Sequence, residues 1–159
     1  MTEVTSLPSA TISPEELAVW KVLLRAQVQI SRHLHNELLA GHDLALGSYD
    51  VLQNLAEQPD GRLRMNDLAD RVLLSRSGLT RLVDRLQRDG LVRRESCASD
   101  ARGLFAVITK RGGLRLREAT PTHQRGVREH LLGRLGREEL GLLGTTLARL
   151  TDEPEALTA

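Results

Sequence analysis

The hydrophobic period of this chain changes within residues 66–109, and that change limits the possible folds more than any other feature. Apolar residues recur first at helical spacing, in two short segments separated by the connection Leu73-Leu74-Ser75. They recur next in two strand-like runs with a polar, turn-forming stretch between them. The predicted elements are helices over residues 66–72 and 76–89 and strands over residues 91–95 and 104–109. Together they describe a winged helix-turn-helix, in which a two-stranded hairpin, the wing, follows the second helix.

The predicted helix at residues 76–89 has an apolar face and a basic face. Ser75 is well placed to cap it, as Asn66 is for the helix before it. A helix that packs through its apolar face can enter the major groove of DNA with its N-terminal residues first. The apolar face consists of Leu79, Leu82, Val83 and Leu86. The candidate DNA-contacting residues are Ser75, Arg76, Ser77, Thr80, Arg81 and Arg85.

These residue types suit different parts of a DNA duplex. Ser75 and the free N–H groups of the helix N-terminus suit a phosphate, as does Arg76. Ser77 and Thr80 are short enough to approach base edges. Arg81 can reach a guanine, whereas Arg85 is better placed for the DNA backbone.

The hairpin tip, residues 99–103, is built from small residues around one arginine. Arg102 projects from this turn, a shape that fits a narrow minor groove, where the negative potential is enhanced. Asp100, two residues earlier, is placed to brace that guanidinium by a charge-assisted hydrogen bond. Taken alone, the hairpin is better explained as an ordinary surface turn with a solvent-facing arginine, and only the preceding pair of helices favours DNA binding.

Charge is unevenly distributed along the chain. Residues 62–117 carry fourteen Lys/Arg against six Asp/Glu, whereas the other residues carry eight against fifteen. A basic block between acidic flanks is what a surface that binds a polyanion leaves in a sequence. Charge alone is also compatible with an ordinary solvated surface on which arginines are scattered.

Long helices are predicted on both sides of the winged unit. Ser13-Pro14-Glu15-Glu16 combines a capping residue, a proline at the first helical position and a capping-box glutamate, and Gly41 offers a left-handed stop. A helix of this length measures about 40 Å. Its apolar stripe is wide enough for contacts on two sides, so we expect it to pair with a second copy. After the wing, a helix from Lys110 to about Leu135 should be kinked or split by Pro121.

The expected organisation is therefore modular. It comprises a flexible arm (residues 1–12), an N-terminal dimerisation helix (13–45), a winged helix-turn-helix DNA-binding domain (46–109), C-terminal dimerisation helices (110–150) and a flexible tail (151–159).

Several stretches resemble the MarR family of bacterial transcription regulators. They are LADRVLLSRSGLTRLVDRL at residues 68–86, GLVRR at residues 90–94, LGSYDVL at residues 46–52, the Asp-x-Arg of the wing tip and TKRG at residues 109–112. The resemblance spans about residues 14–150 and becomes specific when the stretches are combined. Leu73 is a departure, because many helix-turn-helix proteins have glycine in this turn. The sequence therefore predicts a turn that manages without a left-handed residue or has a different geometry.

The resemblance implies a homodimeric repressor that binds double-stranded DNA at a pseudo-palindromic operator. The helix at residues 76–89 would lie in the major groove and the wing arginine, Arg102, in the minor groove. It also implies that a small aromatic or phenolic effector releases the DNA. The candidate effector-binding residues are Trp20, Arg25, His35 and Tyr49. Trp20 also fits a core or dimer anchor, which is the more ordinary use of a helical tryptophan.

Other chemistry finds little support in the sequence. His33 and His35 would point to different faces of a helix, and His123 and His130 share a face but lack a third ligand nearby in the sequence. We therefore expect no metal site and no cofactor. The single cysteine, Cys97, reads as an incidental small residue.

Three classes of function compete. An enzyme is disfavoured because nucleophile elbows, phosphate loops and metal-ligand spacings are missing from the sequence. The alternative to a specific regulator is a winged-helix module that binds proteins, or DNA non-specifically, without an effector. The sequence has no long apolar stretch and no pattern of a signal peptide at Met1–Ala10, so a cytoplasmic protein without membrane contact is expected.

Overall fold

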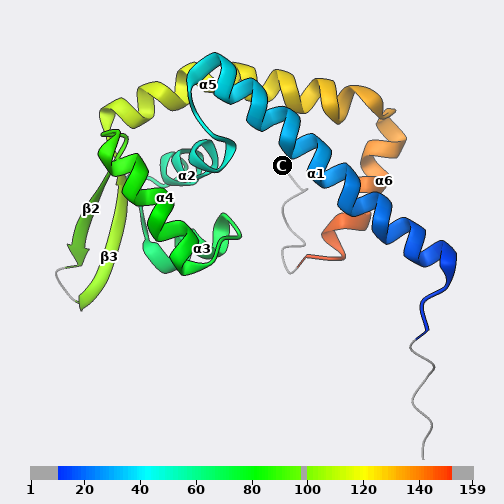
Figure 1. Ribbon diagram of the computed structural model, residues 1–159, viewed down its shortest axis with the longest axis horizontal. Coiled ribbons are helices and arrows are strands. Elements are labelled where there is room, and N and C mark those ends of the chain that lie inside the picture. Colours follow the sequence, from blue (N-terminus) through cyan, green and yellow to red (C-terminus); the bar gives the residue numbers. More distant parts are fainter. Residues whose placement is uncertain (1–10, 98–99, 152–159) are drawn as a thin grey trace, which may run out of the picture.

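The computed structural model describes residues 11–97 and 100–151 (Figure 1). The three strands form one antiparallel sheet in the order β1-β3-β2. The predicted winged helix-turn-helix, mostly helical, is confirmed. In chain order the elements are α1 (Pro14–His42), α2 (Leu46–Ala56), β1 (Arg62–Arg64), α3 (Met65–Arg71), α4 (Arg76–Arg88), β2 (Val92–Cys97), β3 (Asp100–Ile108), α5 (Lys110–His130), the 3₁₀ helix η1 (Leu132–Arg134) and α6 (Arg137–Ala148).

The long helix α1 begins as its sequence predicts. The Ser13 hydroxyl accepts a hydrogen bond from the Glu16 N–H at 3.2 Å, and a Glu16 carboxylate oxygen accepts one from the Ser13 N–H at 2.7 Å, which completes a capping box. The predicted stop at Gly41 is wrong by two residues. The helix continues to His42, and Asp43 takes the left-handed conformation with φ 48°.

The turn between α3 and α4 contains a left-handed leucine. Leu73 has φ 53° and its side chain is 91% exposed, so the sequence-based expectation of a turn without a left-handed residue is wrong. Ser75 caps α4 as predicted, accepting a hydrogen bond from the Gly78 N–H at 3.1 Å. The predicted cap at Asn66 is also wrong. Helix α3 starts at Met65, so Asn66 lies inside its first turn.

The sheet contains a short strand that the sequence analysis missed. Strand β1 pairs with β3, with Leu63 opposite Ala106, and its burial alternates along its three residues. Three residues are too few for a period-two pattern to stand out in a sequence. This strand ties the segment before α3 to the wing.

Helix α5 is continuous through Pro121, so of the predicted kink or split the split is wrong. A proline removes one backbone hydrogen bond and crowds the preceding turn, but the exposed Pro121 sits on a helix whose opposite face packs tightly against α1. This tertiary packing outweighs the local cost. The helix ends at His130, earlier than predicted.

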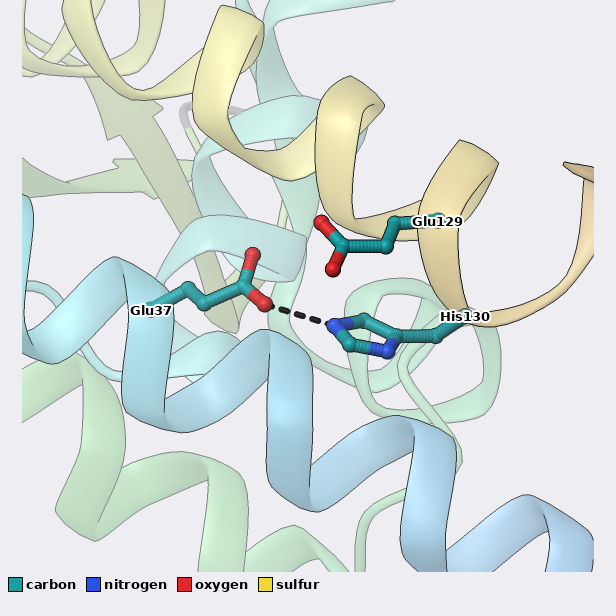
Figure 2. Close-up of side chains that lie close together, drawn as sticks. All are labelled: Glu37, Glu129 and His130. Atoms are coloured by element: carbon teal, nitrogen blue, oxygen red, sulfur yellow. Dashed lines mark hydrogen bonds and ion pairs between the residues drawn. The ribbon is translucent and has the colours of Figure 1, made fainter.

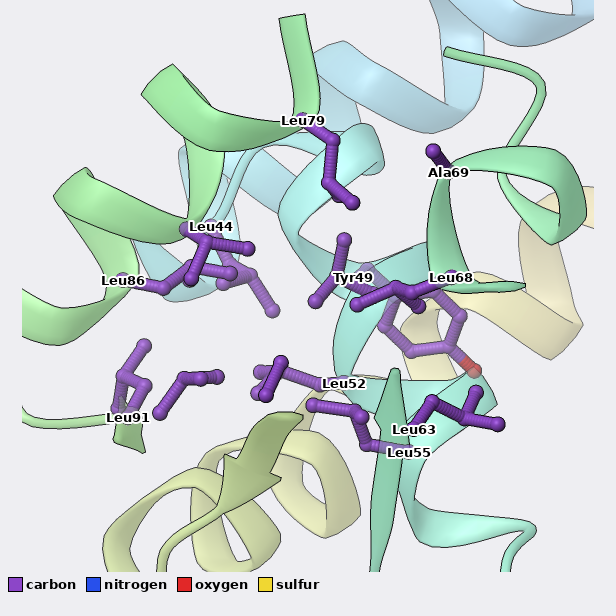
Figure 3. Packing of buried hydrophobic residues seen from close by; sticks show 14 of the residues in the cluster. Leu44, Tyr49, Leu52, Leu55, Leu63, Leu68, Ala69, Leu79, Leu86 and Leu91 are labelled. Carbon is purple, nitrogen blue, oxygen red and sulfur yellow. The ribbon is translucent and has the colours of Figure 1, made fainter. Parts of the chain in front are cut away.

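The core lies within the DNA-binding unit and under the first half of α5 (Figure 3). Small residues on α5 let its backbone approach its neighbours. A Cβ at Gly112 would lie 2.1 Å from the Leu91 carbonyl oxygen, and one at Gly126 would lie 2.6 Å from Leu34 Cδ2. The buried residues at the centre of the core include Leu38, Val51, Leu52, Leu55, Leu68, Leu79, Val83, Leu86 and Val92.

Figure 1 shows α1 and α5 lying side by side, with the wing near one end of α5 and α6 at the other end. No residue of α6 is buried, and the first half of α1 is exposed. The two ends of the molecule therefore differ, with a packed unit at one and uncovered apolar helices at the other.

Candidate nucleic-acid interface

Helix α4 presents one fully buried face and one fully exposed face. Leu79, Val83 and Leu86 are at most 1% exposed and anchor the helix in the core. The predicted contact residues on the opposite face are all exposed: Arg76, Ser77, Thr80, Arg81 and Arg85. Within residues 11–97 and 100–151, the structure pairs none of the three arginines of this set with an acidic side chain. Their guanidinium groups are available to an external anion.

The N-terminus of α4 is exposed and is capped by Ser75. The Ser75 hydroxyl lies 3.1 Å from the Gly78 N–H and 3.3 Å from the Ser77 hydroxyl, so it already occupies one of the free helix donors. The N–H groups of the first residues of α4 have no partner within the helix, and the positive end of the helix dipole adds to their attraction for an anion. This end of α4 suits a phosphate contact.

The Thr80 hydroxyl has less freedom than the sequence suggests. It donates to the main-chain carbonyl of Arg76 at 2.8 Å, so its proton is used within the helix. Its oxygen lone pairs and its methyl group remain available. Thr80 can therefore accept a hydrogen bond from a base amino group or touch a thymine methyl.

Arg94 serves the protein scaffold, although the sequence places it in the same basic block. Its guanidinium donates to Asp84 Oδ1 at 2.7 Å, to Gln87 Oε1 at 3.1 Å and to the Thr80 carbonyl at 3.3 Å. Its side chain is only 22% exposed. Arg94 thus fixes α4 against β2 and does not add a free charge to the surface.

The wing projects from the sheet beside α4 (Figure 1). Asp100 and Arg102 belong to strand β3, whose backbone the structure describes. The side chains of these two residues, like that of Cys97, lie outside the part of the chain that it describes. Residues 98–99 lie outside it as well. The predicted roles of Asp100 and Arg102 at the wing tip therefore stay predictions.

The outer face of the sheet carries an arginine–aromatic group that sequence reasoning missed. The guanidinium carbons of Arg62 and Arg64 lie 5.0 and 5.4 Å from the centre of the Phe105 ring. Arg62 also hydrogen-bonds Asp60 at 2.6 Å, which lowers the pKa of that carboxyl. The only sequence signal for this group is the spacing of two between Arg62 and Arg64, which places both side chains on one face of a strand. It could be recognised only once β1 was known to be a strand.

A cleft of about 630 Å³ opens between α2 and α5. Tyr49 and His123 stack in its wall with ring centroids 4.3 Å apart, and burial lowers the pKa of His123. On α2, burial raises the pKa of the adjacent Asp50 to about 6. The residues that line the cleft are Tyr49, Gln53, Ala56, Glu57, Leu116, Thr120, His123, Gln124, Val127, Arg128 and Leu132.

The structure does not bring the four predicted effector residues together. Tyr49 lines the cleft, whereas Trp20, Arg25 and His35 do not. Trp20 and Arg25 lie on the exposed part of α1, and His35 Nδ1 accepts a hydrogen bond from the Leu46 N–H at 3.4 Å. Sequence reasoning missed His123, because only the packing of α5 against α2 shows that it lies on Tyr49.

Comparison with known proteins places this geometry in a family. The sequence profile described as MarR family matches residues 42–103. A MarR family transcriptional regulator from Streptomyces coelicolor, solved in complex with DNA, is 35% identical, with a TM-score of 0.84; the match covers 92% of this chain and 96% of that one. MhqR, an HTH-type transcriptional regulator from Bacillus subtilis, is 29% identical over 87% of this chain and 93% of its own length.

A second Bacillus subtilis protein, the HTH-type transcriptional repressor YetL, is 33% identical, but the match covers 57% of this chain and 54% of that protein. The family assignment therefore rests on the matches that span nearly the whole chain. None of the described helices is long and apolar enough to cross a membrane. The exposed basic face of α4, the wing and these similarities agree that the chain belongs to the MarR family of DNA-binding transcription regulators, and that it is not an enzyme.

Proposed function

We propose that this protein is a homodimeric repressor that reads a pseudo-palindromic operator and releases it when a small aromatic or phenolic effector binds. The observation that carries the DNA-binding part is the exposed face of α4, where Arg76, Arg81 and Arg85 have no acidic partner among the described residues. On the opposite face of α4, the buried side chains of Leu79, Val83 and Leu86 anchor the helix in the core. A rigid helix with free guanidinium groups can discriminate bases rather than merely attract phosphates.

The dimer is supported by uncovered apolar residues at the end of the molecule opposite the wing. Trp20 is 54% exposed and Leu142 is 68% exposed, which is unusual for large apolar side chains that gather on two helices. The exposed large apolar residues in the first half of α1 are Leu17, Val19, Trp20, Val22, Leu23, Leu24 and Val28, and those of α6 include Leu140, Leu142 and Leu147. A second copy of the chain would cover both sets and place two α4 helices about 34 Å apart, one turn of duplex.

A tryptophan at the centre of such an interface is typically a hot spot. Trp20→Ala should weaken dimerisation by about 2 kcal/mol, or roughly 30-fold in the dissociation constant. Sedimentation velocity over a dilution series measures this directly. Leu73→Ala is the matched control, because it removes an exposed leucine from the turn before α4 and should leave the dimer unchanged. Equal dimer strength in both variants would contradict the proposed interface.

The effector is proposed to bind in the α2–α5 cleft. Its apolar lining includes Leu116, Val127 and Leu132, and its polar lining includes Arg128. These groups suit an aromatic ring that carries a hydroxyl or carboxylate. Because the cleft lies between α2 of the DNA-binding unit and the long helix α5, a ligand there can favour a dimer in which the α4 helices are mis-spaced. His123→Ala should abolish release by phenolic acids and keep operator binding.

Selection of bound duplexes from a random pool, at a stated salt concentration, tests DNA reading. An inverted repeat with half-sites about ten base pairs apart is expected. Arg81→Glu should prevent enrichment, while Arg117→Glu, with the same charge change on α5, should not. Thr80→Ala or Arg81→Ala should change base preference at defined positions, whereas Arg102→Ala should weaken binding to every sequence. Steeply salt-dependent binding without an enriched sequence would instead indicate a non-specific module.

A further inference from the structure

Three side chains of types that can bind a metal meet at the C-terminal end of α5, and none of them belongs to the α4 surface or lines the α2–α5 cleft. Glu37 comes from α1, and Glu129 and His130 are consecutive on α5 (Figure 2). One ligand atom of each residue lies within 4.8 Å of the others, and His130 Nε2 lies 2.6 Å from Glu37 Oε1. We propose that these three residues bind a divalent transition-metal ion, best satisfied by Zn²⁺, that ties α1 to α5.

The backbone is arranged so that Glu37 can reach this point. Gly126 lies one helical turn before His130, and a Cβ there would be 2.7 Å from Glu37 Oε2. The glutamate side chain thus occupies the space that any larger residue at position 126 would fill. This close approach carries the α1 carboxylate to the imidazole of α5.

His130 is held as a fixed ligand. Its side chain is only 10% exposed, and its ring stacks on that of His33 with centroids 4.3 Å apart and an interplanar angle of 14°. Its Nδ1 atom is buried and has no hydrogen-bond partner within the described residues. A ring whose orientation is fixed loses little further freedom when it binds a metal.

The two carboxylates lack cationic side chains of their own. Apart from His130, the part of the chain described here places no basic side chain within 4.0 Å of the carboxylate of Glu37 or Glu129. Arg134 is close, but its Nε donates to the main-chain carbonyl of Glu129 at 3.1 Å. With a neutral imidazole the cluster carries two negative charges, which a divalent cation would balance.

This donor set matches the chemistry of zinc. Zn²⁺ takes histidine nitrogen and carboxylate oxygen at about 2.0–2.2 Å, and three protein ligands leave a position for water. When Nε2 binds the ion, the ring proton must reside on Nδ1. Gln29 lines the same cavity of about 150 Å³ as His130, and its exposed side chain carries an amide oxygen, a hydrogen-bond acceptor. Glu129 is exposed, so rotation of its side chain can close the remaining distance.

Sequence analysis paired His123 with His130 and found no third ligand. The structure replaces that pair with ligands from two helices that are far apart in the sequence, with 91 residues between Glu37 and Glu129. The expectation of no metal site is therefore revised by this proposal.

The test is a Zn²⁺ titration of the chelator-treated full chain by calorimetry, without DNA or effector. One ion per chain is expected. Glu37→Gln and His130→Gln should each weaken binding at least about tenfold, and Glu129→Gln should weaken it as well. Glu118→Gln, an exposed acid on the same helix, should bind as the parent does. Co²⁺ substitution should give visible absorption bands that the three ligand variants lose.

The titration can overturn the proposed metal site. No saturable binding by the parent, or equal affinity in the parent and all three variants, would overturn the site. Because Glu129 is exposed, Glu129→Gln remains informative even if His130→Gln disturbs folding, which circular dichroism would reveal. Metal binding is measured without DNA, so its failure would leave the proposed regulator function untouched.

Discussion

Leu73 provides a direct test of how the helix-turn-helix turn is built. Its backbone is left-handed at φ 53°, a conformation that costs a side chain with a Cβ roughly 1–2 kcal/mol. Glycine does not suffer this cost but loses more freedom on folding, by roughly 0.5–1 kcal/mol. Because the Leu73 side chain is 91% exposed, its removal loses almost no burial. Leu73→Gly should therefore raise the free energy of unfolding by about 0.5–1 kcal/mol.

Urea denaturation at one fixed protein concentration is the assay, supported by a rise in melting temperature of about 1–4 °C. The matched control is Leu73→Ala, which removes the same exposed side chain but keeps the Cβ. The free energy of unfolding of Leu73→Ala should lie within about 0.5 kcal/mol of that of the parent. If Leu73→Gly is no more stable than Leu73→Ala, with the denaturant slope unchanged, the left-handed residue is not strained and the reasoning fails.

Three further changes test packing, bracing and burial. Gly126→Ala should lower the urea midpoint by the equivalent of about 1–3 kcal/mol, because its Cβ would overlap Leu34 and Glu37, whereas Gly141→Ala, with open space around it, should not. Arg94→Ala should lower both melting temperature and operator affinity, because α4 loses its brace to β2, while Arg93→Ala, which breaks only an exposed pair, should change little. Asp50 has a folded pKa of about 6 against 3.8, so the folded state binds more protons between these values and stability falls as pH rises through that range. Asp50→Asn should flatten this slope in urea titrations at pH 4 and pH 7, and an unchanged slope would contradict the assignment.

The helices α1 and α4 were predictable because their signals are local. The apolar spacing of α4, the Ser75 cap and the Ser13 capping box depend on residues within a turn or two of each other. Errors occurred where tertiary contacts decide. Pro121 stays inside α5 because that helix packs along α1, and the three-residue strand β1 exists only because β3 lies beside it.

The arginines illustrate why a site is harder to predict than a fold. Composition places Arg81 and Arg94 in one basic block, and nothing in their local sequence separates them. Their surroundings do: Arg81 points away from the core, whereas Arg94 is occupied by Asp84, Gln87 and a main-chain carbonyl of α4. A count of positive charges therefore overstates the number of groups that can bind DNA.

The cluster of Glu37, Glu129 and His130 at the C-terminal end of α5 also depends on tertiary contacts. Glu37 and His130 are separated by 92 intervening residues, and their pairing depends on a single close helix contact at Gly126. A local reading of α5 could compare His130 only with its helical neighbours, such as His123, which the structure assigns to Tyr49 instead. The two histidines that share a helical face thus belong to different sites, one on the α2–α5 cleft and one on the proposed metal site. Since α5 carries both, an ion that fixes its C-terminal end against α1 would also limit how far the cleft wall can move, which links the two sites through one rigid helix.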